Sequence, residues 1–562
     1  MSIDRAHEIR IVVDPQPPNT VAAVRLVVTA TLGPGWQVRR LIPRKPLIVV
    51  SGRSDEPVAT VGHARRSHQA AMALAATGRF ARVEADVPIR GYAENEQRAS
   101  ADETRADDAE IADAGLDGAG LDEAEIGPIP QAQPEPPRDW VHRILRWEQA
   151  LAAMSADVRG GRGIRIGHPD TGYTLHQNLG LTGLDLTTDR DVIDNDADAL
   201  DDLQQNALWP LPFPGHGTAT ASVIVGHGPV SAGIVGLVQE ARLVPVRAIE
   251  SVVQVFDSDV AKAVEHARRV GCHVISMSLG GKGFFGLEEQ IQQAVDAGLI
   301  VMAAAGNFVR FVTAPASYPS CLAVAATGPG DVPWSGSSRG PAVDVSMPGS
   351  QVYTAQFTED HKPIVGLANG TSFAVAHLAG AAALWLAHHG RDTLIRRYGV
   401  RRIQATFLAV LRTPGVCVVP RGWPAGWGVG RVDLPSLLSA PLPSLPGPAV
   451  AFTGSTAEAE PEPTAAVSET ARRIAYALGA DPEVVQIRLV ELLGMETADT
   501  EQFAEQLQLH EGELVYLAYT DPGFAASVSS RAEALADVGA AEIAIEPRGV
   551  SDSLAALLTA RG

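Results

Sequence analysis

The sequence predicts an α/β protein whose central domain is a mostly parallel sheet flanked by helices, with a smaller domain on either side. From Trp140 to about Ala440, short apolar runs such as IRIGHPD and HVISMSLG alternate with Ala-rich helical stretches such as Ser258–Val270. These runs are almost continuously apolar, as strands must be when helices cover both faces of their sheet. At 562 residues the chain is also too long for one hydrophobic core. The sequence divides into five parts: 1–95, 96–137, 138–441, 442–467 and 468–562.

Residues 1–95 are predicted to form a ferredoxin-like α+β domain. The expected elements are a strand at Ile9–Val13, a helix or long strand at Thr20–Leu32, a strand pair within Trp36–Val50, a helix at Ser67–Thr77 and a strand at Phe80–Val87. Their order is β, α, β, β, α, β, which is the order of that fold.

Two segments have the composition of linkers. Between Ala101 and Pro137 the chain carries eleven Asp or Glu and one Arg, and it ends in a proline-rich run, so 96–137 is expected to be disordered. Residues 442–467 form a second, proline-rich linker. The net charge is −20, and about half of it lies in the acidic linker. Because phosphates require Lys and Arg opposite them, neither nucleic acid nor an anionic membrane is expected as a partner.

Residues 468–562 are predicted to be a small α+β module without a catalytic signature. Asp481-Pro482 is a helix start, with an N-cap and a proline in the first turn. A strand at Leu514–Tyr519, a helix near Ala525–Asp537 and a strand at Glu542–Glu546 are expected to follow.

The compartment expected from the sequence is the cytoplasm. Three scattered cysteines, Cys272, Cys321 and Cys417, indicate neither a disulfide framework nor a zinc site. The polar start MSIDRAHEIR is unlike a signal peptide, and no uninterrupted apolar run has the length of about 18 residues that a membrane span needs. The excess of Arg over Lys is typical of a bacterial genome rich in G and C.

Three stretches carry candidate catalytic groups at strand or helix ends, where open sheets place their ligands. Asp170 ends the apolar run in IRIGHPDTGY, His216 opens the helical pattern of GHGTATASVIVG, and Ser372 lies in NGTSFAVAHLAG. Acyl transfer by a serine needs a base that takes its proton and a carboxylate that orients the base. The three residues could supply these groups.

Each residue also has a plainer interpretation. Asp170 could form a turn, His216 could lie on the surface, and Ser372 could cap a helix by accepting hydrogen bonds from unpaired N–H groups. The DTG triplet also occurs in aspartic proteases, which hold two such carboxylates together. One DTG alone would need a symmetric dimer and would leave His216 and Ser372 unexplained.

Taken together, the motifs resemble the subtilisin-like serine protease (subtilase) family, in which the triad also runs Asp, His, Ser along the chain. Eight stretches agree in order: HPDTGYTLHQNL, GHGTATA, ISMSLGG, AAAGN, APASYPSCLAVAAT, WSGSSRGPAVDVSMPG, GTSFAVAHLAG and GWGVGRVDLPSLL. The resemblance spans Trp140 to about Ala440 and implies a serine endopeptidase that acts on protein or peptide substrates and requires no cofactor.

The resemblance assigns roles to residues of this sequence. Ser372 would be the nucleophile, His216 the general base and then acid, Asp170 its orienting partner, and Asn307 the oxyanion donor. The implied substrate-binding residues are Ser278, Leu279 and Gly280 on an edge strand, with Ala304 and Gly306 in a pocket wall. The family usually has other residues at Ser222, Met347, Phe373 and Ala376, which puts substrate preference in question more than the proton-transfer groups.

The N-terminal region resembles subtilase propeptides in the stretch SHQAAMALAATGRFARVEADVPIR. The resemblance implies a zymogen in which this domain is an intramolecular chaperone and inhibitor that is removed autocatalytically. The long acidic linker and the missing signal sequence differ from that pattern, so retention as a regulatory domain stays open.

The acidic run at Asp191–Asp202 is a candidate calcium loop. Asp194, Asp196 and Asp198 have the first spacings of an EF-hand, but Ala199 and Gln205 occupy the places of its glycine and final glutamate. The run is therefore not an EF-hand. Because subtilases often bind calcium in surface loops, the resemblance allows a structural calcium ion here, against the alternative of a solvated acidic turn.

Two alternatives to a general endopeptidase are left open. The first is a catalytically silent subtilase fold that serves as a protein-binding module, although the presence of Asp170, His216, Asn307 and Ser372 speaks against it. The second is a processing enzyme whose C-terminal module recruits one protein substrate.

Overall fold

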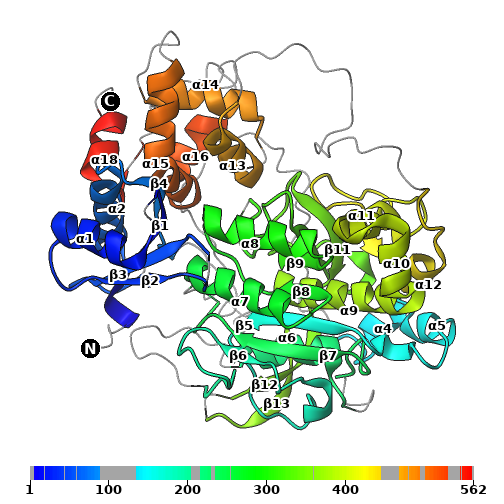
Figure 1. Ribbon diagram of the computed structural model, residues 1–562. Coiled ribbons are helices and arrows are strands. Elements are labelled where there is room, and N and C mark those ends of the chain that lie inside the picture. The colour runs from blue at the N-terminus through cyan, green and yellow to red at the C-terminus, as the bar shows by residue number, and fades with distance from the viewer. Residues whose placement is uncertain are drawn as a thin grey trace.

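The computed structural model describes residues 5–88, 135–203, 215–228, 234–444, 467–529 and 545–559, apart from positions 18, 44, 59, 253–254, 310, 359, 479, 494–499 and 546. Nearly all of the predicted linker 96–137 lies outside the described residues, as do most of the linker 442–467 and of the predicted strand Glu542–Glu546. Figure 1 shows the N-terminal domain in blue, the C-terminal helices in orange and red beside it, and the central domain in cyan to yellow.

The N-terminal domain has the predicted ferredoxin-like order. Its elements are β1 (Glu8–Pro15), α1 (Val21–Leu32), β2 (Gln37–Arg40), β3 (Ile48–Arg53), α2 (Val61–Ala75) and β4 (Phe80–Ala85). The strands form an antiparallel sheet in the order β2-β3-β1-β4. The segment after Thr20 is a helix because the Thr20 hydroxyl accepts a hydrogen bond from the Ala23 N–H and caps it.

The central domain alternates strands and helices as predicted. Its first half comprises α4 (Trp140–Ile144), α5 (Trp147–Ala152), β5 (Arg165–Asp170), β6 (Arg190–Asp191), α6 (His216–Val225), β7 (Arg242–Arg247), α7 (Asp257–Arg269), β8 (Val274–Met277) and α8 (Phe285–Asp296). Its second half comprises β9 (Ile300–Ala304), β10 (Leu322–Thr327), β11 (Val343–Pro348), β12 (Val352–Phe357), β13 (Pro363–Ala368), α9 (Thr371–His389), α10 (Arg391–Tyr398), α11 (Ile403–Leu411), β14 (Cys417–Val418), β15 (Arg431–Val432) and α12 (Leu434–Ser439).

Nine strands form the central sheet in the order β14-β15-β11-β10-β9-β8-β5-β7-β6. All neighbouring pairs are parallel except β14 with β15. The strand order reverses at β5, since β6 and β7 lie on one side of it and β8 to β11 lie on the other. In open α/β sheets such a reversal opens a crevice at the carboxyl ends of the strands, where ligands bind.

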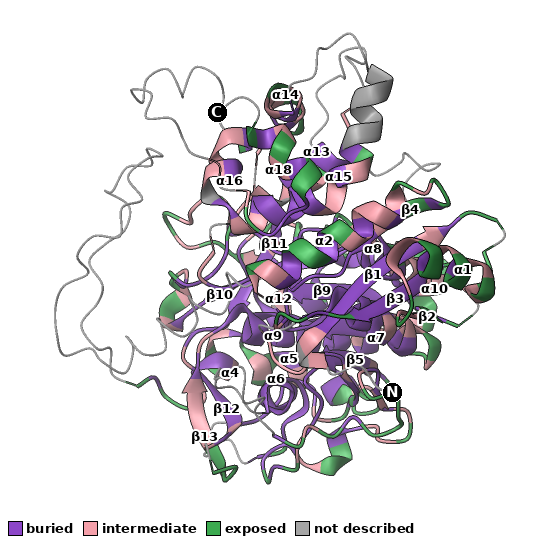
Figure 2. Ribbon diagram, turned by 90° about the vertical axis from the view of Figure 1, so that its left-hand side faces the viewer, coloured by how far each residue is buried: buried purple, intermediate pink, exposed green. Residues whose placement is uncertain are grey.

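Helices cover both faces of the central sheet. Along β9, Ile300 and Met302 join the core that contains α9, whereas Val301 and Ala303 join the core that contains α7 and α8. Figure 2 shows the strands around this core as buried. Among the described helices, α9 is long and apolar enough to cross a bilayer, but 94% of its apolar window is buried inside the protein. It is the central core helix of the domain.

The described part of the C-terminal module is helical, so the prediction of a strand at Leu514–Tyr519 is wrong. The helices are α13 (Glu469–Leu478), α14 (Pro482–Leu492), α15 (Thr500–Thr520), α16 (Pro522–Ser529) and α18 (Asp552–Thr559). The short apolar run around Leu514 lies inside α15 and is buried between helices and the N-terminal sheet. A buried helix segment and a buried strand have the same pattern over a few residues, which explains the error. The predicted helix start at Asp481 is confirmed, because its carboxylate caps α14.

Both faces of the N-terminal sheet are covered. Ile11 and Val13 of β1 face α1, α2 and the C-terminal helices, and Val12 faces the core cluster that contains α7 and α8 of the central domain. On this second face, Arg10 forms a buried ion pair with Asp259 of α7 at 2.6 Å. The N-terminal domain is therefore packed into the protein on two sides.

Carboxylates of the N-terminal domain lie at the start of two central helices. Glu84 accepts a hydrogen bond from the Phe285 N–H at 3.4 Å, and Asp86 accepts one from the Ser258 N–H at 3.3 Å. The unpaired N–H groups at a helix start favour negative charge. The N-terminal domain thus supplies acceptors that α8 and α7 lack within their own sequences.

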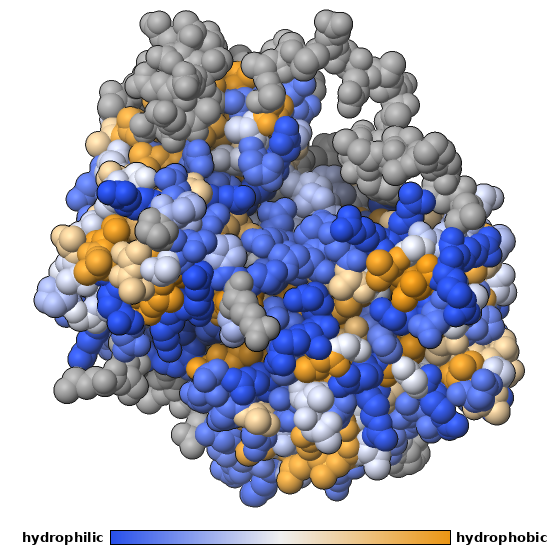
Figure 3. Space-filling model, viewed as in Figure 1, coloured by the Kyte–Doolittle hydropathy of each residue, from blue (hydrophilic) through white to orange (hydrophobic). Residues whose placement is uncertain are grey.

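The surface seen in Figure 3 is largely hydrophilic, with hydrophobic residues scattered over it. Large exposed apolar side chains include Leu26 on α1 and Leu175 in the loop after β5, which belong to different domains. Single apolar residues of this kind are normal on protein surfaces.

We predict that Asp257→Asn reduces the loss of stability on raising the pH. Burial, together with the neighbouring Asp86 carboxylate, raises the pKa of Asp257 to about 8. A carboxyl with a raised pKa must keep its proton in the folded state, so its contribution to stability falls between about pH 4 and pH 8, by at most about 1.4 kcal/mol per pH unit. In the wild type, Asp257 Oδ2 accepts a hydrogen bond from the Gly283 N–H at 3.0 Å. Asparagine needs no added proton and keeps an oxygen that can accept this bond.

The measurement is the urea midpoint by circular dichroism at about pH 5 and about pH 8. The midpoint of the variant should exceed that of the wild type by more at the higher pH. Asp360→Asn, on an exposed loop, is the control. Equal pH dependence in all three proteins would contradict the prediction.

Candidate active site

Asp170 and His216, the first two residues predicted to act together, form a buried hydrogen bond. His216 Nδ1 donates to Asp170 Oδ1 at 2.7 Å, and the Thr171 N–H donates to the same carboxylate oxygen at 2.7 Å. Although burial raises the pKa of Asp170, the charge and hydrogen bond of His216 hold it below its usual value. The carboxylate is therefore ionised and fixes the orientation of the imidazole ring.

The loop after β5 docks on the start of α6 and brings the two residues together. The Thr171 hydroxyl accepts a hydrogen bond from the Gly217 N–H at 3.0 Å. A Cβ atom on Gly217 would lie 2.2 Å from the Gly172 carbonyl oxygen, so a side chain there would separate the loop from the helix. Gly172 has a φ of 104°, a conformation that favours glycine. The glycines of the DTG and HG motifs thus have a packing role.

Ser372 lies in the first turn of α9 and does not cap it. The N-cap residue is Gly370, which has no side chain to cap the helix. The Ser372 hydroxyl donates to the Ser278 carbonyl oxygen at 3.4 Å, and the Ser278 hydroxyl donates to the Ser372 carbonyl oxygen at 2.9 Å. The plainer interpretation of Ser372 as a helix cap is therefore wrong.

Asn307 holds the start of α9. Its side-chain oxygen accepts hydrogen bonds from both the N–H and the hydroxyl of Thr371, each at 2.9 Å. The Thr371 hydroxyl in turn accepts from the Gly306 N–H at 3.2 Å. Because the amide oxygen is anchored, the amide NH₂ group is the end of Asn307 that can donate to a substrate next to Ser372.

The structure brings the four predicted catalytic residues to one place. The His216 ring lies 6.4 Å from the ring of Phe373, the residue after Ser372, measured between ring centroids. Asn307 contacts Thr371, the residue before Ser372, and Asp170 contacts His216. Ser372, Asn307 and His216 are all buried, and Ser372 is 8% exposed.

The predicted substrate-binding residues border this site from two strands. Ser278, Leu279 and Gly280 directly follow β8 and are buried. Ala304 ends β9, and Gly306 follows it with a φ of 119°. Both segments lie beside the start of α9, since Ser278 bonds to Ser372 and Gly306 bonds to Thr371.

Two polar residues next to Asp170, His168 and Thr220, were not predicted from the sequence to belong to the site. His168 is fully buried, with Nε2 at 3.0 Å from the Thr220 hydroxyl and 3.7 Å from Asp170 Oδ2. The Thr220 hydroxyl lies 3.3 Å from the same carboxylate oxygen. Burial lowers the pKa of His168, so its imidazole is neutral. The available signal was a histidine two positions before Asp170 in an apolar strand, which places both side chains on one face.

The acidic loop after β6 uses its carboxylates within the protein. Asp191 and Asp194 both contact Arg247, the latter at 2.8 Å. Asp198 accepts hydrogen bonds from the Leu200 N–H and the Tyr173 hydroxyl. In the described part of the chain, no group of three or more His, Cys, Asp or Glu side chains is arranged to hold a metal ion.

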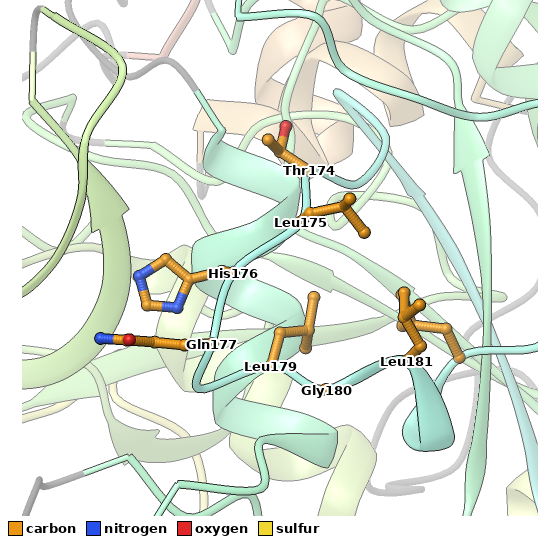
Figure 4. Close-up of a pocket in the computed structure, with 8 residues that line it drawn as sticks. Thr174, Leu175, His176, Gln177, Leu179, Gly180 and Leu181 are labelled. Carbon is orange, nitrogen blue, oxygen red and sulfur yellow. The ribbon is translucent and has the colours of Figure 1, made fainter.

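A pocket of about 320 Å³ opens in the loop that follows Asp170 (Figure 4). Its lining residues are Thr174, Leu175, His176, Gln177, Leu179, Gly180, Leu181 and Leu184. None of the predicted catalytic or substrate-binding residues is among them, so the pocket is not the site of the proposed chemistry.

Known proteins resemble this chain in sequence. Residues 161–409 match the sequence model of the Subtilase family. Thermitase from Thermoactinomyces vulgaris is 34% identical over 247 residues, which are 44% of this chain and 82% of thermitase. Subtilisin E from Bacillus subtilis is 36% identical over 180 residues, which are 31% of this chain and 46% of that relative.

A solved structure extends the likeness of the fold. Fervidolysin from Fervidobacterium pennivorans, described as a keratinolytic enzyme related to subtilisin, aligns with a TM-score of 0.51 and 20% identity. The alignment covers 79% of this chain and 63% of fervidolysin. At this identity the likeness concerns the fold alone.

The fold and the sequence relatives define a protein with the subtilisin-like α/β architecture. The chain belongs to the subtilase family of serine proteases. The prediction of the family, of the fold class and of a serine protease as the class of enzyme is confirmed.

We predict that Thr371→Val lowers kcat on a peptide substrate about 10- to 100-fold, since a complete oxyanion donor is worth about 10²–10³. Valine removes the hydroxyl that anchors the Asn307 amide and accepts from the Gly306 N–H. KM should change little, because Thr371 is fully buried and presents no surface to a substrate. Thr371→Ser keeps the hydroxyl and is the matched control. Equal losses in both variants, or a change in KM alone, would contradict this positioning role.

Proposed function

We propose that the protein is a serine endopeptidase that hydrolyses peptide bonds through Asp170, His216 and Ser372. The observation that supports this most directly is the buried Asp170–His216 hydrogen bond beside the start of α9, where Ser372 lies next to the anchored Asn307. A serine hydroxyl, an oriented imidazole and an oriented amide are the groups that acyl transfer requires.

In the proposed reaction, the Ser372 oxygen attacks the carbonyl carbon of the substrate while His216 Nε2 takes the hydroxyl proton. The Ser372 hydroxyl must first turn from the Ser278 carbonyl oxygen, to which it donates at 3.4 Å, toward the imidazole. The tetrahedral intermediate collapses to an acyl-enzyme as His216 returns the proton to the leaving amine. A water molecule then repeats the attack, again with His216 as base, and releases the acid product.

The negative charge of the intermediate develops at the start of α9. The Asn307 amide NH₂ group and the backbone N–H of Ser372 are the proposed donors to this oxyanion. The positive end of the α9 dipole adds to their effect. The proposed catalytic groups and oxyanion donors all belong to side chains or the backbone of this chain. We therefore expect the reaction to need no cofactor.

The proposed substrate is an extended polypeptide. Its backbone would form hydrogen bonds with Ser278, Leu279 and Gly280, so that the substrate lies beside them as an added strand. The substrate side chain before the cleaved bond would lie next to Ala304 and Gly306. Phe373, whose ring lies 6.4 Å from the His216 ring, would narrow the substrate-binding site next to His216. Location in the cytoplasm and a structural calcium ion stay predictions.

We further propose that the N-terminal domain inhibits the peptidase domain or assists its folding, and that the chain is cleaved by its own active site between the two. The capping of α7 and α8 by Asp86 and Glu84 supports a role in folding, because the two helices lack these acceptors without that domain. The buried Arg10–Asp259 pair supports a specific orientation.

We predict that a fluorophosphonate probe labels the wild-type protein and fails to label Ser372→Ala, since the probe bonds only to an activated serine. Intact mass should show the wild type cleaved between Tyr92 and Arg138 and the variant uncut. Asp170→Asn, which keeps the shape of the carboxylate, should be labelled far more slowly than the wild type.

Absence of labelling in both proteins, even after the first 137 residues are removed, would favour the silent protein-binding module instead. Labelling that persists in Ser372→Ala would place the nucleophile elsewhere. Labelling without cleavage would retain the peptidase and reject the self-processing.

A further inference from the structure

We propose that the C-terminal helical module, α13 to α18, binds the N-terminal domain and holds it on the peptidase domain, so that the N-terminal domain stays bound when the acidic linker is cut. This inference goes beyond the proposed function and does not depend on it. Both partners of the module lie within this chain.

The first observation is a hydrophobic core that the two terminal parts share. One continuous cluster of buried side chains contains residues of both, and α15 lies against β4 and α2 (Figure 1). The members from the N-terminal domain include Ile11, Ala71 and Leu74, and those from the module include Leu507, Leu514, Leu517 and Leu554. Separating the parts would expose this cluster to water, which is unfavourable in proportion to its apolar area.

Polar contacts specify how the helices meet. His68 Nδ1, on α2, donates to the Gly549 carbonyl oxygen at 2.7 Å, and its ring stacks edge-on against Tyr516 with 5.1 Å between centroids. Asp552, at the start of α18, accepts hydrogen bonds from Arg65 and Gln69 of α2. The module therefore docks in one defined register.

A buried charge cluster joins all three parts of the chain. Glu84 of the N-terminal domain pairs with Lys282 of the peptidase domain at 2.7 Å and with Arg473 of the module at 3.8 Å. Lys282 is 0% exposed in its side chain, Glu84 4% and Arg473 8%. Arg473 also pairs with Glu511 at 2.6 Å. Although burial raises the pKa of Glu84, the two cations hold it below its usual value.

The module also touches the peptidase domain directly. Tyr519 of α15 stacks edge-on against Phe311 with 5.0 Å between centroids, and Tyr476 of α13 packs against the core cluster around α7 and α8. Close fit to the N-terminal domain is required at Gly512, where a Cβ atom would lie 2.6 Å from Glu84 Cγ. Because the module contacts both other parts, it braces the N-terminal domain against the peptidase domain.

The N-terminal domain is consequently held by both other parts of the chain. Release from the peptidase domain would separate Lys282 from its carboxylate and would also break the contacts with the module or carry the module along. Breaking a buried pair by removing one partner is strongly destabilising. Cutting the linker removes a covalent tether but none of these contacts.

The experiment uses the full chain with Ser372→Ala, so that no cleavage depends on the activity of the protein itself. A recognition sequence for an external protease is inserted between Ala106 and Asp107, and a different one between Gly454 and Ser455. After the first cut alone, the N-terminal fragment should co-elute with the remainder in size exclusion at micromolar protein and physiological salt. After both cuts, the three fragments should co-elute as one species.

The rate at which the cut, labelled N-terminal fragment dissociates gives the quantitative test. Arg473→Met should accelerate it about tenfold or more, because one member of a buried charge cluster is lost. Arg472→Met, at the next position, is the matched control, since Arg472 is 55% exposed and pairs with Glu469 inside the module. Circular dichroism of the uncut variants establishes that both fold.

Separation of the N-terminal fragment after the first cut would overturn the proposal, as would equal dissociation rates for Arg473→Met and Arg472→Met. Should Arg473→Met not fold, His68→Ala provides the same comparison, with Arg66→Ala as its control, since Arg66 is 45% exposed and pairs with Asp55 inside the N-terminal domain. Since every protein here lacks Ser372, these outcomes are independent of the labelling that tests the proposed peptidase.

Discussion

A single buried carboxylate, Glu84, connects the three parts of this chain. A charge that is 4% exposed in its side chain is tolerated only where cations and hydrogen-bond donors surround it. Lys282 comes from the peptidase domain, Arg473 from the C-terminal module, and the Phe285 N–H from the start of α8. Each part of the chain thus contributes a charge or a donor to this cluster, and the terminal regions also share one hydrophobic core although the whole peptidase domain separates them in sequence.

The proposed active site follows from the direction of the central sheet. In a parallel sheet the carboxyl ends of the strands share one edge, and the helices that return from that edge can start there. Asp170 ends β5, Ser278 follows β8 and Asn307 follows β9, while His216 and Ser372 begin α6 and α9. Backbone N–H groups at the start of α6 and of α9 donate hydrogen bonds to Thr171 and to Asn307, and these bonds fasten each helix start to the loop of a strand. The site is thus built from backbone geometry that two glycines, Gly172 and Gly217, make possible.

The N-terminal domain contacts the rest of the protein through both faces of its sheet. Here one face of its sheet packs toward α7 and α8 and the other toward its own helices and the C-terminal module. Burial and repulsion from Asp86 raise the pKa of the Asp257 carboxyl group to about 8. As the pH rises, loss of the Asp257 proton therefore disfavours this packing. Stability of the assembly and its response to pH therefore arise at the same interface.

The sequence by itself determined the family, the order of the strands and helices in the central domain, and the residues of the proposed catalytic site, because each depends on local patterns at strand and helix ends. It also determined the ferredoxin-like order, since capping residues and period-two alternation are local signals. Only the tertiary structure decided that Leu514–Tyr519 is helix, because a short apolar run does not distinguish a strand from a buried helix. It alone also revealed the Glu84, Lys282 and Arg473 cluster and His168 behind Asp170. Charged residues far apart in sequence give no sign of meeting, since their pairing is set by how the domains pack and not by any pattern along the chain.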